Sequence, residues 1–328
     1  MMRTPSSLRN RSADDRGFRL GTGFFALLVV LLVAGIFFEL YRTSHLSISK
    51  FGFKFWTGKV WDPVAGEFGA LPFIWGTLYS SLLAMLISTP IALGIAIFLS
   101  ELSPKILRTP LAFLTELLAA IPSIVYGLWG VFVLVPIVRQ LQVITPDWMR
   151  KIPLFSGPPL GVGMLAAALI LAVMVIPFTS SVAREVLKAV PYTQREAAYA
   201  LGATRWEAIL AALRFGRTGI IGAIILGFGR AVGETMAVTM VIGNNPQISA
   251  SLFKPQYTMA AVIANEFTEA ADDLYLSALI EIGLVLFVIT LIINGLSRLL
   301  IWSVTREVKV KMPKVLAPAV PRAPEAAA

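Results

Sequence analysis

Residues Val190–Glu207, VPYTQREAAYALGATRWE, form a charged segment between two long apolar runs, and the rest of the chain is organised around them. Thr193 precedes Glu196 by three positions, and Thr204 precedes Glu207 in the same way. This spacing predicts two capping boxes, in which a hydroxyl and a carboxylate satisfy the free backbone groups at the start of a helix. Gly202 lies between them, where a residue without a Cβ can take the left-handed conformation that ends a helix. The segment is therefore predicted to be two short helices hinged at a glycine.

The composition indicates an integral membrane protein. Of the 328 residues, 57% are hydrophobic and only 14% are charged, which is too apolar for a soluble domain. Cysteine is absent, which excludes disulfides, thiolate metal sites and cysteine nucleophiles, and a single histidine, His45, argues against a metal centre. The net charge of +9 is explained by basic membrane loops rather than by nucleic-acid binding. We expect membrane lipid around the chain, and neither nucleic acid nor a cofactor bound to it.

Six apolar runs are long enough for helices across a hydrocarbon core of about 30 Å. They are continuous rather than alternating, which argues against a β-barrel. The predicted class is an all-α integral membrane protein with six transmembrane helices. The predicted spans are residues 20–40, 74–100, 111–138, 161–179, 219–243 and 275–301.

The remaining segments complete the predicted division of the chain. Residues 1–19 are a polar, basic tail without apolar periodicity, and residues 41–73 are an external loop whose aromatic rings are expected to anchor at the membrane interface. Residues 74–301 are the transmembrane core, which contains the charged loop 180–218. Residues 302–328 are an Ala/Pro-rich flexible tail.

Two polar patterns inside these segments invite a functional interpretation. Gly52–Val60 looks superficially like a P-loop, but five residues separate its glycines and Val60 replaces the Mg²⁺-binding hydroxyl, so we expect no nucleotide site there. In the second span, Thr77, Ser81 and Ser88 lie at near-helical spacing. This stripe either lines a polar path or allows close helix packing.

The distribution of basic residues predicts the orientation. With the N-terminus inside, the segments 1–19, 101–110, 180–218 and 298–328 hold 19 Lys and Arg, against 8 in the opposite loops. Cytoplasmic loops carry the excess of basic residues. Both termini and the charged loop are therefore predicted to be cytoplasmic.

The charged loop resembles the EAA loop of permeases from type I ABC importers. The resemblance rests on Glu196, Ala197, Ala198 and Gly202, although the tail Ala212–Phe215 lacks the usual proline. It implies the type I importer permease fold and a loop that docks on a separate ATPase. ATP hydrolysis would then occur on a partner, so this chain is expected to be a transport subunit and not an enzyme.

Two further stretches are similar to the PstC family of phosphate-permease subunits. They are GFGRAVGETMAVTMVIGN, residues 227–244, and AAIPSIVYGLWG, residues 119–130, and the similarity extends from about residue 51 to 304. The resemblance implies a plasma (inner) membrane importer of inorganic phosphate. Its implied partners are a second, PstA-like permease, a dimer of PstB-like ATPases and an external PstS-like phosphate-binding protein.

Arg230 and Glu234 lie inside the predicted fifth span, one helical turn apart on the same face. A charge at mid-membrane costs roughly 2.5–3.5 kcal/mol on insertion scales, so both should face protein or water. The guanidinium suits an oxyanion, and Glu234 would orient it and prevent it from trapping the anion. The family resemblance associates this pair with translocation. The alternative is a buried pair that only fixes helix packing.

Other interpretations stay open at this point. Gly229 and Gly233 would let another helix approach closely, and Glu281 in the sixth span either contributes to the path or serves as a cap or interface residue. The chain could carry another oxyanion, such as molybdate or sulfate. An ion-coupled secondary transporter would also use an intramembrane Arg/Glu pair, but no inverted repeat stands out and that class needs no ATPase-docking loop.

Overall fold

The computed structural model describes residues 6–306, with side chains described from Phe18 to Ser303. The regular secondary structure of this part of the chain is helical except for one antiparallel hairpin of β1 (Trp61–Asp62) and β2 (Glu67–Phe68). The α-helices are α1 Ser6–Thr43, α2 His45–Phe51, α3 Lys54–Thr57, α4 Leu71–Ile97, α5 Lys105–Ala120, α6 Ser123–Trp129, α7 Val135–Ile144, α8 Asp147–Arg150, α9 Met164–Ala189, α10 Tyr192–Ala200, α11 Arg205–Phe215, α12 Arg217–Val232, α13 Met236–Val241, α14 Met259–Glu266 and α15 Asp273–Arg306. The π-helical segments Phe98–Leu102 and Gly130–Leu134 and the 3-10 turn Pro153–Phe155 complete the set.

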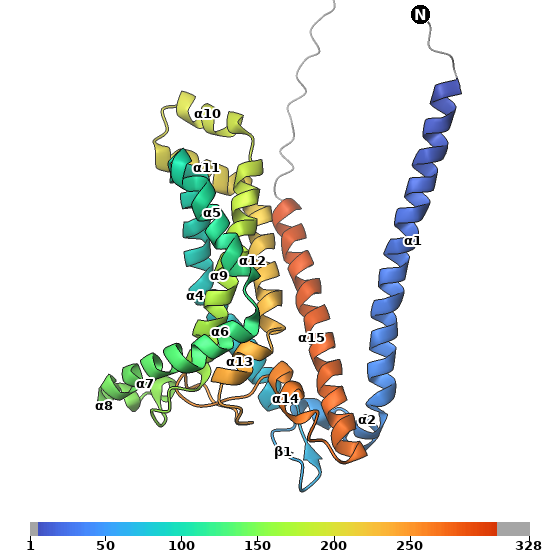
Figure 1. Ribbon diagram of the computed structural model, residues 1–328, viewed down its shortest axis with the longest axis vertical. Helices are drawn as coiled ribbons and strands as arrows, with labels where there is room; N and C mark the ends of the chain where they lie inside the picture. The colour runs from blue at the N-terminus through green and yellow to red at the C-terminus, as the bar shows by residue number, and fades with distance from the viewer. Residues whose placement is uncertain (1–5, 307–328) are drawn as a thin grey trace, which may run out of the picture.

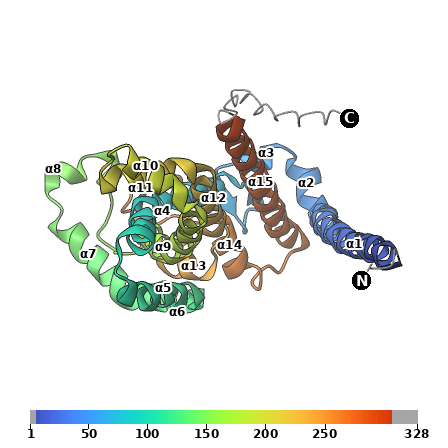
Figure 2. The same cartoon turned by 90° about the horizontal axis from the view of Figure 1, so that it is seen from above.

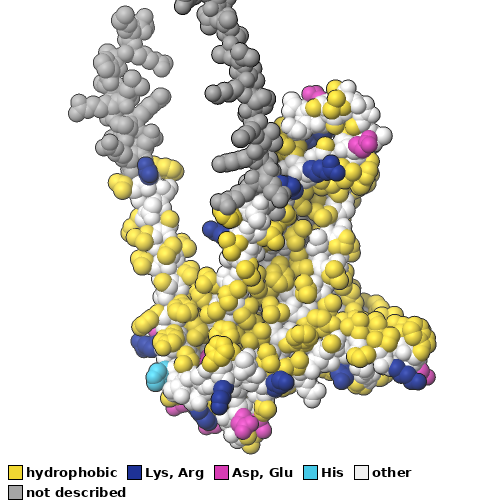
Figure 3. Space-filling view, turned by 180° about the vertical axis from the view of Figure 1, so that it is seen from behind, with side chains coloured by type: hydrophobic (Ala, Val, Ile, Leu, Met, Phe, Trp, Pro, Cys, Tyr) yellow, Lys and Arg dark blue, Asp and Glu magenta, His cyan; other side chains and the backbone are white. Residues whose placement is uncertain are grey.

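The arrangement is that of a membrane bundle. Among the described residues, five helices are long and apolar enough to cross a membrane, and a sixth crossing is counted if α11 and α12, which are bent by 69° relative to each other, are taken together. Figure 1 shows α1, α4, α9, α12 and α15 running in roughly the same direction along the molecule, with the shorter α5 beside α9. Hydrophobic side chains cover the middle of the face in Figure 3, whereas charged side chains gather toward its ends. The predicted all-α membrane class is confirmed.

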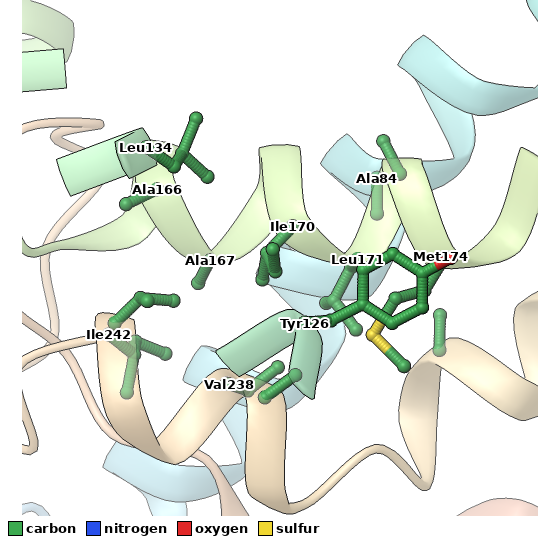
Figure 4. Packing of buried hydrophobic residues seen from close by; sticks show 14 of the residues in the cluster. Ala84, Tyr126, Leu134, Ala166, Ala167, Ile170, Leu171, Met174, Val238 and Ile242 are labelled. Atoms are coloured by element: carbon green, nitrogen blue, oxygen red, sulfur yellow. The ribbon is translucent and has the colours of Figure 1, made fainter. Parts of the chain in front are cut away.

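The core of the bundle lies between α4 and α9, where small side chains let the two helices approach closely. Figure 4 shows the ring of Tyr126, from α6, lying among Leu171 and Met174 of α9. The hydroxyl stripe of α4 is also packed within the chain, in part against α14, where Met259 N donates to Thr77 Oγ1 at 2.9 Å. Its three residues, Thr77, Ser81 and Ser88, are at most 1% exposed. This burial agrees with the packing interpretation of the stripe rather than with a polar path.

The predicted third span, residues 111–138, is not one helix. α5 ends at Ala120, and the chain turns at Ile121 and Pro122, both of which have extended backbone. Proline lacks the N–H that a helix needs and disfavours the α conformation in the residue before it. α5 therefore runs beside α9, α6 packs against α13, and α7 leaves the bundle sideways (Figures 1 and 2).

The predicted fifth span, residues 219–243, is also interrupted. α12 ends at Val232 with Gly233 as its C-cap, residues 233–235 are not helical, and α13 begins at Met236. This break changes the geometry expected for Glu234, which lies in it.

The first helix is longer than predicted. α1 begins at Ser6 rather than near residue 20, so the described part of the predicted polar tail, residues 6 to 19, is helical. α1 stands apart from the bundle in both ribbon views, and the apolar window of its membrane span is 0% buried. It meets α15, where the Phe37 and Phe287 rings lie 5.7 Å apart. At the other end of the chain α15 extends to Arg306, and the rest of the predicted flexible tail lies outside the described residues.

Most of the loop 41–73 folds into α2, α3 and the hairpin. Phe55 and Phe68 are buried, and the ring of Trp61 lies 4.8 Å from that of Phe68 and 4.9 Å from that of Phe73. Trp61 Nε1 also donates a hydrogen bond of 2.8 Å to Glu266 at the end of α14. The expected interfacial anchors are therefore mostly an aromatic core that joins this loop to α14 and α15. Phe53 is the exception, since it is 81% exposed.

Candidate functional site

The charged loop is two helices hinged at a glycine, as predicted. α10 ends at Ala200, and Gly202 follows with φ +81°. Gly202 N donates to Tyr199 O at 2.9 Å and Ala203 N donates to Ala198 O at 3.1 Å, which is the pair of bonds that closes a Schellman motif. A Cβ at position 202 would meet nothing within 4 Å. Glycine is therefore required here by backbone conformation and not by crowding.

The two predicted capping boxes have different outcomes. The box at Thr204 and Glu207 is confirmed, since Thr204 N donates to the Glu207 carboxylate at 2.7 Å and Glu207 N donates to Thr204 Oγ1. The box at Thr193 and Glu196 is wrong. α10 begins at Tyr192, directly after the extended Pro191, and has no side-chain cap. Because proline already breaks the helix at 191, Thr193 lies inside the first turn, where its hydroxyl cannot serve as the N-cap.

The loop presents an exposed surface at one end of the molecule (Figure 1). Of the four residues expected to couple to an ATPase, Glu196, Ala197 and Gly202 are exposed and Ala198 is half-buried. Large apolar side chains are exposed on the same two helices and at their junction, and no other part of this chain covers them. They are Tyr192, Tyr199, Leu201 and Trp206, and Leu201 is 90% exposed.

Arg230 and Glu234, expected to pair within one helix, are not joined by an ion pair in this structure. Arg230 lies in the last turn of α12, is exposed, and has its guanidinium carbon 5.8 Å from the centroid of the Phe178 ring of α9. Glu234 lies in the break, and its carboxylate accepts a hydrogen bond of 3.3 Å from Ala237 N at the start of α13. The predicted one-turn spacing is wrong because the helix stops at Val232. Within the described residues, Arg230 and Glu234 therefore do not form the buried ion pair that the packing interpretation requires.

The glycines around Arg230 have unequal roles. A Cβ on Gly229 would meet nothing within 4 Å, and one on Gly233 would be 3.6 Å from Gly229 O, so the expected close helix approach does not occur at this pair within the chain. It occurs instead at Gly227, where a Cβ would collide with Thr179 Oγ1 and lie 3.1 Å from Val175. Gly227 was missed in the sequence because nothing local distinguishes a glycine that touches another helix from one that faces open space.

Other residues near the site also escaped the sequence analysis. Two aromatic residues are neighbours of Arg230. The Phe178 ring lies beside its guanidinium, and Tyr126 is close enough to feel its charge. Glu101 and Arg195 form an ion pair on the side of the charged loop. Glu281 is 2% exposed and lies against Ser47 of α2, so it belongs to the contact between α2 and α15.

Comparisons with known proteins agree with this geometry. The family described as binding-protein-dependent transport system inner membrane component matches residues 88–306. The phosphate transport system permease protein PstC of Haemophilus influenzae is 48% identical, over 89% of this chain and 94% of its own length. The protein of the same name from Mesorhizobium japonicum is 45% identical, over 91% and 93%.

A more distant relative and a solved structure extend the comparison. The probable phosphate transport system permease protein PstC of Methanocaldococcus jannaschii is 37% identical, over 83% of this chain and 87% of its own. A chain of the inward-facing MetNI methionine ABC transporter superposes with a TM-score of 0.53 at 18% identity, over 71% of this chain and 95% of that one. The solved structure supports the fold alone. The chain belongs to the binding-protein-dependent transport system inner membrane components and, within that family, to the PstC permease proteins.

Proposed function

We propose that this chain is the permease subunit of an ATP-driven importer of inorganic phosphate. The names of its relatives motivate the substrate. The observation that carries the mechanism is Arg230, a guanidinium at the end of an apolar helix that has no carboxylate partner among the described residues. A charge in such a place must face water or protein because lipid solvates it poorly.

The free guanidinium is suited to bind an oxyanion. Its planar fork donates two parallel hydrogen bonds, a geometry that matches phosphate. Phe178 lies beside it and supports the cation from one side. Glu234 is held at the start of α13 by Ala237 N instead of neutralising Arg230. In this proposal its negative charge keeps the anion from binding so tightly that it cannot leave.

The hinged loop is proposed to be the contact with the ATPase. The exposed face of α10 and α11 combines Glu196, Ala197 and Ala198 with apolar side chains that this chain leaves uncovered. A partner that covers this face would bury that surface. We propose a PstB-like ATPase dimer at this face, a second PstA-like permease that completes the path, and a PstS-like binding protein outside, with ATP hydrolysis on the ATPase.

The orientation proposed is that both termini and the hinged loop lie in the cytoplasm of a bacterial inner membrane. The excess of Lys and Arg supports it, as does Figure 1, where the start of α1, the end of α15 and the pair α10–α11 lie at the same end. Reporter fusions after residues 60, 150 and 260 should all report an external location. An internal signal from any of them would contradict the orientation.

The function is tested by transport. The complete complex should be reconstituted in proteoliposomes with the binding protein outside and ATP inside, and uptake of radiolabelled phosphate compared with that of sulfate and molybdate. We expect ATP-dependent uptake of phosphate in preference to the other two. Preference for another oxyanion would replace the substrate, and uptake driven by an ion gradient without ATP would contradict the importer mechanism.

A further inference from the structure

An ion pair joins the hinged loop to the membrane helices. Glu101 lies on the π-helical segment that continues α4, and Arg195 lies in α10. Arg195 Nε donates to Glu101 Oε2 at 3.1 Å, and Arg195 Nη2 donates to Glu101 Oε1. The two residues are 94 positions apart in the sequence. This is the fork-to-fork geometry that makes arginine–carboxylate pairs directional.

The same arginine also binds the end of α9. Arg195 Nη1 donates to Val190 O and Nη2 donates to Leu187 O, both at 3.0 Å. These carbonyls belong to the last turn and C-cap of α9, where the helix has no partner of its own. Arg205, at the start of α11, donates from Nη2 to Glu101 O at 2.9 Å. The cluster of Glu101, Arg195 and Arg205 therefore connects α4, α9, α10 and α11.

The surroundings favour a transmitting role for this cluster. The side chains of Arg195 and Glu101 are only 12% and 11% exposed, whereas the other residues of α10 are exposed or half-buried. The position of α10 relative to the bundle therefore depends strongly on this pair. Glu101, Arg195 and Arg205 also line a polar pocket of about 590 Å³ between the π-helical segment and α10.

The segment that carries Glu101 is a point where α4 can adjust. Ser103 N donates to Phe98 O at 2.7 Å, an i to i+5 bond in place of the α-helical pattern. Such π-segments are frequent at functional sites. Glu101, the partner of Arg195, therefore lies on a segment of α4 whose hydrogen bonding already departs from the α-helical pattern.

We infer that Glu101 and Arg195 are positioning residues that transmit movement of the hinged loop to α4 and α9. This rests on the proposed function, because it assigns the coupling between ATP hydrolysis and transport. Neither residue touches the substrate. Arg195 must be an arginine, since lysine keeps the charge but offers no fork.

The first experiment measures coupling in the reconstituted complex. The variants are Glu101→Gln and Arg195→Lys. The control is Glu116→Gln, which removes the carboxylate of a different ion pair, between Glu116 and Arg184. The Glu116 side chain is 55% exposed. We expect Glu101→Gln and Arg195→Lys to assemble and hydrolyse ATP, while phosphate transported per ATP falls about tenfold. Glu116→Gln should keep the parental ratio. A parental ratio in both test variants would overturn the inference, as would an equal fall of ATP hydrolysis and uptake, which indicates a structural role.

A second measurement does not depend on phosphate. The chain has no native cysteine, so spin labels can be placed at Leu201→Cys and Ile106→Cys, which are 90% and 86% exposed. In the reconstituted permeases before the ATPase is added, where Leu201 is still uncovered, Glu101→Gln should broaden the distance distribution between the labels, and Glu116→Gln should not. An unchanged distribution in Glu101→Gln would refute the link. Failure of the parent complex to import phosphate would instead refute the proposed substrate and leave this measurement valid.

Discussion

Two arginine–glutamate combinations in this chain behave in opposite ways. Arg230 and Glu234 are four positions apart and do not form an ion pair, whereas Glu101 and Arg195 are 94 positions apart and form a bidentate one. The difference lies in the backbone, because a helix end separates the first pair and a helix contact brings the second together. A guanidinium such as that of Arg195, whose three nitrogens all donate to its own chain, holds elements in place. One whose donors are free can bind a ligand.

The largest effect that this comparison predicts is at Arg230. In Arg230→Gln, phosphate uptake should fall about 10- to 100-fold, since a hydrogen bond to a charged group contributes about 1.5–3 kcal/mol. Complex yield should stay at the parental level because Arg230 is exposed and unpaired within the described residues. Initial uptake rates and the yield of purified complex measure the two effects.

Two companion variants sharpen this test. Arg139→Gln removes another exposed arginine, on α7, and should leave uptake unchanged. The double variant Arg230→Gln/Glu234→Gln should transport as poorly as Arg230→Gln, because no cation remains to meet the anion. Return of uptake to near the parental rate in the double variant would mean that the two residues form a structural pair after all.

The next effect concerns the hinged loop, which the Glu101–Arg195 ion pair holds against the membrane helices. Gly202→Val places a β-branched residue at φ +81°, at a cost of order 1–2 kcal/mol. Binding of the ATPase should weaken about 5- to 30-fold, measured by titrating purified ATPase onto the reconstituted permeases. Gly202→Asn is the matched control, since asparagine tolerates this conformation. Equal affinity in the Val variant would show that the ion pair alone fixes the loop.

A smaller effect is expected at Glu234. Glu234→Gln keeps an oxygen that can accept from Ala237 N but removes the negative charge beside the proposed anion site. The maximal uptake rate should fall about two- to fivefold, because a solvent-screened charge effect is worth at most about 1 kcal/mol, and the apparent KM should fall with it. Initial rates over a range of phosphate concentrations separate the two parameters. A raised KM would contradict the role of Glu234 in anion release.

The smallest effect is a pH dependence of the cap on α11. Hydrogen bonds from the Thr204 backbone and hydroxyl lower the pKa of Glu207 below its usual 4.5. The lowered pKa means that the cap stabilises α11 above pH 4.5 and that this contribution is lost as the pH falls through the folded-state value. The ¹⁹F signal of 5-fluorotryptophan at Trp206, assigned with Trp206→Phe, should shift in that acid range. Glu207→Gln should abolish the shift, and an unaltered titration in that variant would exclude the cap as its cause.

The sequence by itself determined the features that depend on nearby residues. Long apolar runs predicted a helical membrane protein, because only a helix satisfies its own backbone within lipid. Gly202 and the Thr204–Glu207 box predicted the hinge and the start of α11, since caps are formed within a few residues. The resemblance of residues 119–130 and 227–244 to PstC permeases placed the chain in its family.

Only the tertiary structure decided where the charges meet. Pro122 and Gly233 are visible in the sequence, but whether they kink a helix or end it depends on what packs around them, and here both end it. The pairing of Glu101 with Arg195, the fit of Gly227 against Thr179 and the aromatic cluster around Trp61 join residues far apart in the chain. Local propensity carries no information on such contacts, because their free energy arises only after the helices have packed.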